Sequence, residues 1–283
     1  MQHTSTRMNQ HTLNNSYSFE GKGLHTGTYA HMKVMPAPAD SGITFLRTDL
    51  PGMPEIKAVA ENVSNTARST TISQNGGEVV TIEHIMSALT GMGVDNAVIE
   101  LDNREVPILD GSARFYAEAF AKDGLQDQGV PRKLIELPLA IEVKDPKTGS
   151  FVRIEPADEP SADITVDFGS PVLGVQSAHW DLSTDYATQI APCRTFCFYR
   201  EVEFMLKNGL IKGGDLDNAL VITDDGYMGN PTLHFQDECG RHKLLDLLGD
   251  LRLSGGYLKA KITAYKSGHP INTKAAKALR ALL

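Results

Sequence analysis

The sequence predicts an α+β fold in two halves of similar plan, and three observations support this prediction. Residues 81–124 and 241–283 each follow the pattern of a helix, a strand and a second helix. Strand-like, turn-rich sequence precedes each stretch, at 16–80 and at 133–236. The halves share this order of elements far more than they share residues. This pattern is expected of two α+β domains with a common plan.

A turn-rich link separates the halves. The segment "DGLQDQGVPRKL" combines glycines with a proline, and we place the boundary near Pro131. A chain of 283 residues is long enough for two medium-sized domains. We therefore expect domains at 1–130 and 131–283. We also expect a functional cleft between them, because ligand sites are common at domain interfaces.

In the first half, "TIEHIMSAL" predicts a helix from Glu83 to about Thr90. Thr81 is expected to cap its N-terminus, and a carboxylate at Glu83 suits the positive end of the helix dipole. A glycine stop and a strand at 96–101 follow, and a second helix opens near Ser112.

In the second half, "RHKLLDLLGD" predicts a helix whose leucines gather on one side to face a core. His242, Asp246 and Asp250 are spaced four residues apart, so they lie within about 80° of each other on the other side. A solvated polar face is the ordinary interpretation of such a pattern. The His242/Asp246 pair is more specific, because side chains at i and i+4 can turn toward one metal ion. The remaining elements of this half are a strand at 255–265 and a helix at 272–283.

The composition is that of a globular protein with a net charge of −8, which argues against a nucleic-acid surface. The N-terminal segment is polar, and no apolar run approaches the length that spans a bilayer. We therefore expect a cytoplasmic protein. Its cysteines, Cys193, Cys197 and Cys239, are too few for a four-thiolate zinc site, and we interpret them as ordinary buried or partly buried thiols.

The two helices together suggest a metal centre. His84, His242 and Asp246 supply two imidazoles and one carboxylate, which is the ligand set of a catalytic zinc site with an open fourth position. Glu83 adjoins one ligand and could serve as a base toward water. Each residue also has a structural interpretation. Glu83 suits the helix terminus by itself, and His84 borders an apolar stripe where a core histidine is common.

"AYKSGHPIN" adds a candidate acid. We expect His269 in a loop after a strand, where it is available for proton transfer, and Asp250 could hold it as an imidazolium. Pro270 directs the residue before it toward an extended backbone. A solvated loop histidine is the alternative. Lys243 and Lys266 are the nearby cations that an acidic chain needs for an anionic substrate.

An apolar segment, "CRTFCFYREVEFMLKNGLIKGG", crowds Phe196, Phe198 and other large side chains into a short span that ends at Gly214. It could be helix and core, or it could form the wall of a passage for a long aliphatic group. Spacing does not decide between these. "GKGLHTG" fits no phosphate-binding pattern, and we expect a tight turn that presents Leu24 and His25.

These motifs, taken in order, resemble the UDP-3-O-acyl-N-acetylglucosamine deacetylases, the zinc enzymes of the committed step in lipid A biosynthesis. The resemblance runs from about Gly21 to about Ala278. It implies two α+β domains, each with a pair of helices on a β-sheet and a small insert, and an active site between the domains. The motifs that carry it are "GKGLHTG", "TIEHIMSALTGMGVDN", "PILDGSA", "RTFCF", "GLIKGG", "RHKLLDLLGDL" and "TAYKSGHPIN".

The resemblance also implies roles for matching residues. His84, His242 and Asp246 would hold one Zn²⁺ per chain, with Glu83 as the general base. His269, paired with Asp250, would be the general acid. The further roles are an oxyanion donor at Thr195, contacts to charged groups of the substrate at Lys243 and Lys266, packing on the sugar and nucleotide at Phe196, an acyl passage from Phe198 to Gly214, and lining of the site by Leu24 and His25.

The expected substrate is UDP-3-O-(3-hydroxyacyl)-N-acetylglucosamine, whose N-acetyl group would be released as acetate. The resemblance implies a Gram-negative-type envelope. We also expect a monomer, no nucleic-acid partner, and at most transient contact with a membrane surface. Two other functions stay open. One is a metal-dependent amidase of the same fold that acts on another N-acyl substrate. The other is a non-catalytic, zinc-stabilised binding protein, which would have no use for Glu83 and His269 together.

Overall fold

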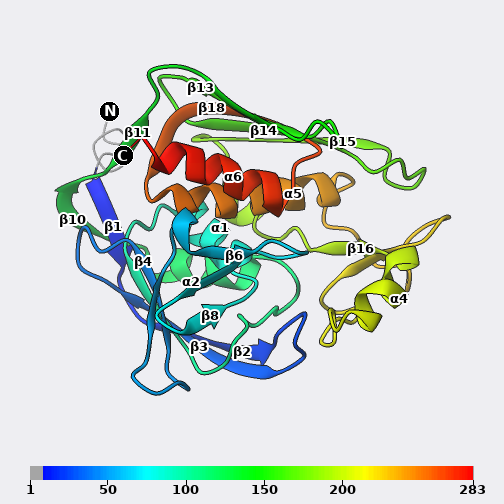
Figure 1. The fold of residues 1–283 in the computed structure, drawn as a ribbon, viewed down its shortest axis with the longest axis horizontal. Coiled ribbons are helices and arrows are strands. Elements are labelled where there is room, and N and C mark those ends of the chain that lie inside the picture. The colour runs from blue at the N-terminus through cyan, green and yellow to red at the C-terminus, as the bar shows by residue number, and fades with distance from the viewer. Residues whose placement is uncertain (1–8, 283) are drawn as a thin grey trace.

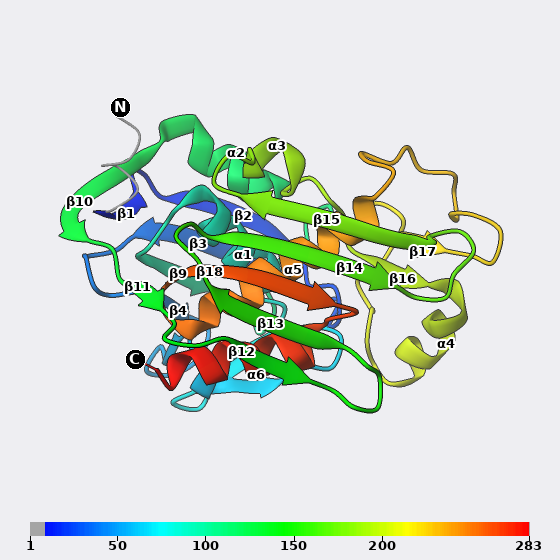
Figure 2. The same ribbon diagram turned by 90° about the horizontal axis from the view of Figure 1, so that it is seen from above.

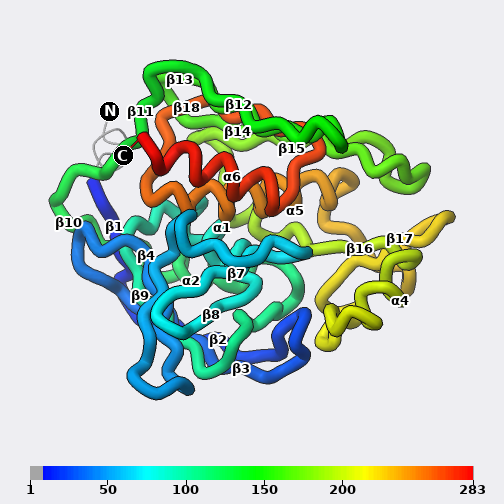
Figure 3. The backbone as a smooth tube through the Cα atoms, in the orientation of Figure 1, coloured from blue at the N-terminus to red at the C-terminus, as the bar shows by residue number. Residues whose placement is uncertain are grey.

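The computed structural model describes residues 9–282. Residues 1–8, the start of the polar N-terminal segment, and residue 283, the end of the last predicted helix, lie outside the described residues. Two β-sheets enclose a middle layer of helices, and a smaller excursion around α4 (Tyr199–Lys207) projects from one end (Figure 1). The backbone trace shows the same excursion standing clear of both sheets (Figure 3). The α+β fold is therefore confirmed.

The first sheet has five strands in the order β2-β3-β9-β4-β5, with β9 at its centre. β9 runs antiparallel to β3 and parallel to β4. Along β3, buried and exposed residues alternate, so Ala30, Met32 and Val34 face the helices. The strands are β2 (Tyr17–Lys22), β3 (Tyr29–Pro36), β4 (Ile43–Arg47), β5 (Glu55–Lys57) and β9 (Ala97–Leu101).

The second sheet repeats this arrangement in the order β12-β13-β18-β14-β15 (Figure 2). Its central strand β18 is antiparallel to β13 and parallel to β14, as β9 is to β3 and β4. A short additional strand also pairs with β18. The strands are β11 (Leu134–Glu136), β12 (Ile141–Lys144), β13 (Phe151–Pro156), β14 (Ser161–Asp167), β15 (Val175–Asp181) and β18 (Tyr257–Tyr265).

The helices confirm the repeated plan. α1 (Glu83–Met92) precedes β9 and α2 (Arg114–Asp123) follows it, just as α5 (Glu238–Leu251) precedes β18 and α6 (His269–Arg280) follows it. The leucine side of α5 is buried, as the sequence predicts. One hydrophobic core includes residues of both sheets and all four helices. The division into domains at 1–130 and 131–283 therefore stays a prediction.

α1 and α5 cross at the centre of this core. A Cβ at Gly249 would meet the backbone carbonyl of Glu83 and the backbone amide of Ser87. Only glycine permits so close an approach. The crossing brings the first turn of α1 against the polar side of α5.

Each half carries an insert, which lies between β5 and α1 in the first half and between β15 and α5 in the second. The first is a three-stranded sheet of β6 (Val63–Asn65), β7 (Thr71–Gln74) and β8 (Gly77–Val79). The second contains β16 (Phe196–Phe198), α4 and β17 (Leu220–Ile222). The remaining elements are β1 (Asn9–Leu13), β10 (Leu125–Pro131), α3 (Tyr186–Gln189) and the 3-10 turns at Ala60–Asn62 and Arg252–Ser254.

Two local predictions were wrong. Thr81 does not cap α1: the N-cap is Ile82, and the Thr81 hydroxyl donates to Glu105 Oε1 at 2.7 Å instead. His269 does not lie in a loop with extended backbone but is the first residue of α6. Pro270 therefore occupies the first turn of a helix, where its missing N–H leaves no hydrogen bond unmade.

Candidate active site

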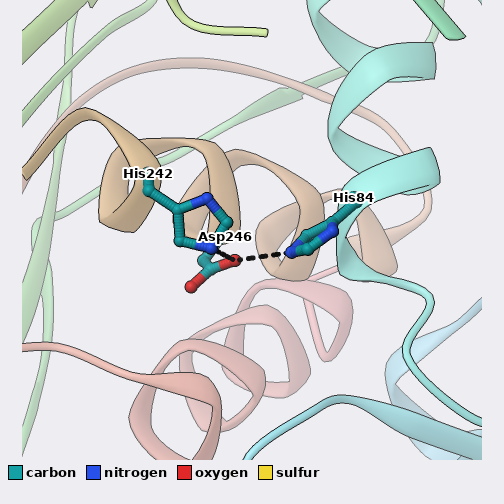
Figure 4. A group of neighbouring side chains, drawn as sticks. All are labelled: His84, His242 and Asp246. Carbon is teal, nitrogen blue, oxygen red and sulfur yellow. Dashed lines mark ion pairs between the residues drawn. The ribbon is translucent and has the colours of Figure 1, made fainter. Parts of the chain in front are cut away.

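The helix crossing brings together the three predicted metal ligands. His84 projects from α1 toward His242 and Asp246 on α5 (Figure 4). His84 Nε2 lies 3.7 Å from Asp246 Oδ1, and His242 Nε2 lies 3.5 Å from the same oxygen. One ligand atom from each residue lies within 4.8 Å of the others, and all three residues are buried. Among the described residues, this is the one group with such geometry.

Hydrogen bonds fix which atoms face the centre of this group. His242 Nδ1 donates a hydrogen bond to the carbonyl of Cys193 at 2.9 Å, which leaves the lone pair of its Nε2 free. Asp246 Oδ2 accepts from Lys243 Nζ at 2.7 Å. Asp246 Oδ1 is buried and has no hydrogen-bond partner in the described chain. An unpartnered buried carboxylate oxygen beside two imidazole nitrogens fits a bound cation.

The environment favours the protonation states that bind metal. Burial lowers the pKa of His84 to about 3, and His242 adds to this effect. Burial also lowers the pKa of His242. Burial would raise the pKa of Asp246, but Lys243 and the neighbouring imidazoles outweigh it and hold that pKa well below the usual range. Neutral imidazoles and an ionised carboxylate are the forms that coordinate a metal.

A carboxyl–imidazole pair, Glu83 and His269, adjoins the three predicted ligands. His269 Nε2 lies 3.7 Å from Glu83 Oε1, and His269 Nδ1 bonds Asp250 Oδ2 at 2.9 Å. Burial raises the pKa of Glu83 to about 8, with the Asp246 and Asp250 carboxylates contributing. Burial opposes protonation of His269, but the carboxylates of Asp250 and Glu83 raise its pKa to about 9. These pKa values lie near the pH range in which a proton acceptor and a proton donor work well.

Two polar residues that hold this pair are absent from the sequence predictions. Thr70 donates its hydroxyl to Asp250 Oδ1 at 2.6 Å, and Asn272 Nδ2 donates to Asp250 Oδ2 at 3.0 Å. Asn272 lies one turn after His269 on α6, so helical spacing could have indicated it. Thr70 precedes β7 in the first insert and has no spacing relation to α5.

A mostly apolar cavity of about 270 Å³ lies at the second insert. Most of the predicted substrate-binding residues meet there. Leu24, His25 and Arg68 come from the first half, and the other lining residues come from the second insert and the residues beside it. The lining residues are Leu24, His25, Arg68, Thr195, Phe196, Cys197, Tyr199, Val202, Met205, Ile211, Gly214, Asp215, Leu216, Ala219, Val221 and Met228. The Thr195 hydroxyl makes no hydrogen bond within the described residues.

Three predicted contacts lie outside this lining. Phe198 is buried in a small second core with Leu220 and Ile222. Lys243 links the three predicted metal ligands to the cavity, because its Nζ contacts Asp246 and lies 5.6 Å from the ring centroid of Phe196. Lys266 forms an ion pair with Asp167 at 3.0 Å.

The turn that presents Leu24 and His25 is held by a buried carboxylate. Glu105 accepts from the backbone amides of His25 and Thr26, and its other hydrogen bond comes from Thr81, just before α1. Within this turn, the carbonyl oxygen of Leu24 accepts a hydrogen bond from the backbone amide of Gly213 at 3.0 Å. One buried side chain therefore connects the start of α1 with the cavity wall.

The chain matches the family described as UDP-3-O-acyl N-acetylglycosamine deacetylase over residues 10–281. The chain belongs to this family. Its members depend on a metal, and the His84, His242 and Asp246 group is a site at which this chain could bind one.

Individual relatives agree in extent and similarity. A protein of Trichormus variabilis named UDP-3-O-acyl-N-acetylglucosamine deacetylase is 42% identical over 97% of this chain and 99% of its own length. A protein of that name from Xanthomonas oryzae is 38% identical over 96% of this chain and 90% of its own length. The "Bifunctional enzyme LpxC/FabZ" of Porphyromonas gingivalis is 43% identical over 96% of this chain, which spans only 64% of that protein.

Proposed function

We propose that this protein hydrolyses the N-acetyl group of UDP-3-O-(3-hydroxyacyl)-N-acetylglucosamine and releases acetate, as a zinc-dependent deacetylase of lipid A biosynthesis. The observation that carries the proposal is the junction of α1, α5 and α6. There, three buried metal-ligand side chains adjoin a carboxyl group and an imidazole 3.7 Å apart. The family, and the names of relatives that match almost end to end, support the same reaction.

His84, His242 and Asp246 would hold one Zn²⁺, because two imidazoles and a carboxylate form a catalytic zinc ligand set. The unpartnered Asp246 Oδ1 and the free Nε2 of His242 fit this group. When bound, Zn²⁺ supplies a Lewis acid and lowers the pKa of a water molecule. The proposed site lies between the domains predicted at 1–130 and 131–283.

The remaining steps belong to side chains of this chain. Glu83 takes a proton from the attacking water at Oε1, since its Oε2 already accepts the Thr70 amide at 3.0 Å. His269 carries a proton on Nε2 and donates it to the departing amine. Asp250 holds the other ring nitrogen, so the imidazole keeps its orientation and its charge. The unengaged Thr195 hydroxyl donates to the developing oxyanion.

The apolar cavity would take the 3-hydroxyacyl chain, with Gly214 leaving room along its wall and Leu24 and His25 at the side of the first half. Phe196 and Lys243 connect the cavity to the metal group and would face the sugar and its nucleotide. Lys266, Phe198 and the rest of the second insert would supply the remaining contacts to the substrate.

Every helix within residues 9–282 is too short or too polar to cross a membrane. We propose a cytoplasmic monomer.

The experiment is acetate release from UDP-3-O-(3-hydroxyacyl)-N-acetylglucosamine, measured on the purified protein, after chelation, and after Zn²⁺ is restored. We expect turnover to vanish and return. Full activity in a sample shown to be free of metal would overturn zinc dependence. A folded, zinc-loaded protein that releases no acetate would overturn the substrate. Activity on other N-acyl sugars would then point to the related amidase, and inactivity on all of them to a binding protein.

A further inference from the structure

We propose that Thr70 is a positioning residue. It holds Glu83, the proton acceptor, and Asp250, the partner of the proton donor His269, in fixed positions relative to each other. The inference rests on the proposed function, because it assigns the proton-transfer roles to Glu83 and His269. Thr70 itself lies outside the cavity lining and is completely buried. It acts through the two carboxyl groups that it contacts.

Three atoms of Thr70 form hydrogen bonds, and each fixes a different part of the site. Its backbone amide donates to Glu83 Oε2 at 3.0 Å. Its carbonyl accepts the amide of Ile82 at 3.2 Å, at the start of α1. Its hydroxyl donates to Asp250 Oδ1 at 2.6 Å, on α5. Thr70 is completely buried, so no water competes for these bonds.

The chain around Thr70 is shaped to deliver it. Arg68 has a φ of 69°, which turns the backbone sharply before β7 begins at Thr71. The Arg68 side chain forms an ion pair with Glu201 on α4 at 2.7 Å. This ion pair links the turn to the second insert, while the tip of the turn reaches the helix crossing.

Thr70 completes the coordination of the Asp250 carboxylate. Oδ2 accepts from both His269 Nδ1 and Asn272 Nδ2, at 2.9 and 3.0 Å, and Oδ1 accepts from Thr70. Donors on both oxygens prevent rotation of the carboxylate. Without the hydroxyl, Oδ1 would be a buried acceptor with one partner fewer, and the carboxylate could turn. His269 would then tilt, and its Nε2 would move relative to Glu83.

The test compares Thr70→Val, which keeps the shape and removes the hydroxyl, with Thr70→Ser, which restores it. Thr71→Val is the matched control, because Thr71 is the next residue, is also buried, and its hydroxyl makes no hydrogen bond within the described residues. We measure kcat and KM for acetate release, bound zinc, and the NMR signal of the His269 Nδ1 proton. The signal is assigned by its loss in His269→Asn.

We expect Thr70→Val to lower kcat roughly ten- to a hundredfold, as loss of a charge-assisted hydrogen bond does, with KM and zinc content unchanged. The Nδ1 proton signal should shift in this variant and return in Thr70→Ser, while Thr71→Val behaves as the wild type. Wild-type kcat together with an unshifted signal in Thr70→Val would overturn the inference. A wild-type protein that releases no acetate would overturn the proposed function instead, and the NMR signal would then decide the positioning role alone.

Discussion

The two halves of the molecule share one strand order but contribute different chemistry. In each, a helix, a central strand and a second helix follow four strands and an insert. α6 begins with His269, which bonds a buried carboxylate, whereas its counterpart α2 begins with Arg114, which pairs with Asp110 at 3.3 Å near the surface. The repeat therefore supplies a scaffold, and the chemistry comes from side chains that the repeat does not share.

The division of roles follows from the same comparison. The first half provides Glu83 and His84, and the second provides His242, Asp246 and the Asp250–His269 pair. Under the proposed mechanism, the proton acceptor comes from one half and the proton donor from the other. Neither half is sufficient, so the crossing of α1 and α5 decides whether the site exists.

The largest effect is expected from removing the contribution of the first half. Glu83→Ala should lower kcat by roughly two to four orders of magnitude, the usual contribution of a general base, while zinc stays bound through three other side chains. Steady-state kinetics and metal analysis of the same sample measure this. Glu118→Ala, an exposed change on α2 of the same half, should leave both unchanged. Zinc lost together with activity would make Glu83 a ligand or a structural residue.

The second prediction concerns the contact between the halves. Gly249→Ala places a methyl group against the backbone of Glu83 and Ser87. Overpacking of this kind costs about 1–3 kcal/mol or more, which exceeds the gain of about 1 kcal/mol from alanine in a helix. We expect a lower free energy of unfolding in urea and a fall in kcat.

Gly226→Ala is the control for this change, because a Cβ there has no described atom within 4 Å. It should leave stability and kcat close to the wild type. If Gly249→Ala were as stable and as active as the wild type, the helix crossing would not set the geometry of the site.

Local patterns predicted much of the fold and most of the site. The leucine stripe and i, i+4 spacing of α5 predicted both the helix and the His242/Asp246 pair, because both depend on neighbours within two turns. His84 and Glu83 were singled out because their residue types would complete a zinc ligand set and supply its base. The repeat of helix, strand and helix was visible for the same local reason.

The rest depended on contacts between distant residues. Thr70 bonds Asp250 across 180 positions of sequence, and no periodicity connects the two. The wrong prediction of a loop at His269 has a similar cause. A proline biases the residue before it toward extended backbone, but packing against α5 favours a helix there. Thr81 had the right residue type for a cap but is held by Glu105 instead.

The smallest expected effect comes from weakening the contribution of the second half. Asp250→Asn keeps the shape of the side chain and removes its charge. Burial lowers the pKa of His269, and the Asp250 charge is the main reason that this pKa is raised to about 9. As the proton donor, His269 must be protonated, so activity falls as the pH rises through its pKa. Asp250→Asn should therefore move the basic limb of the kcat/KM profile to lower pH by about one unit or more.

A second histidine–aspartate pair on the same half serves as the control for this shift. His179 Nδ1 lies 2.7 Å from Asp163 Oδ1 on the exposed face of the second sheet, and Asp163 raises the pKa of His179. Asp163→Asn makes the same chemical change far from the helix crossing and should leave the profile in place. Equal shifts from the two variants would mean that the limb reports net charge. If the basic limb moves only in the Asp250→Asn variant, the buried Asp250–His269 pair is the proton donor that the second half supplies.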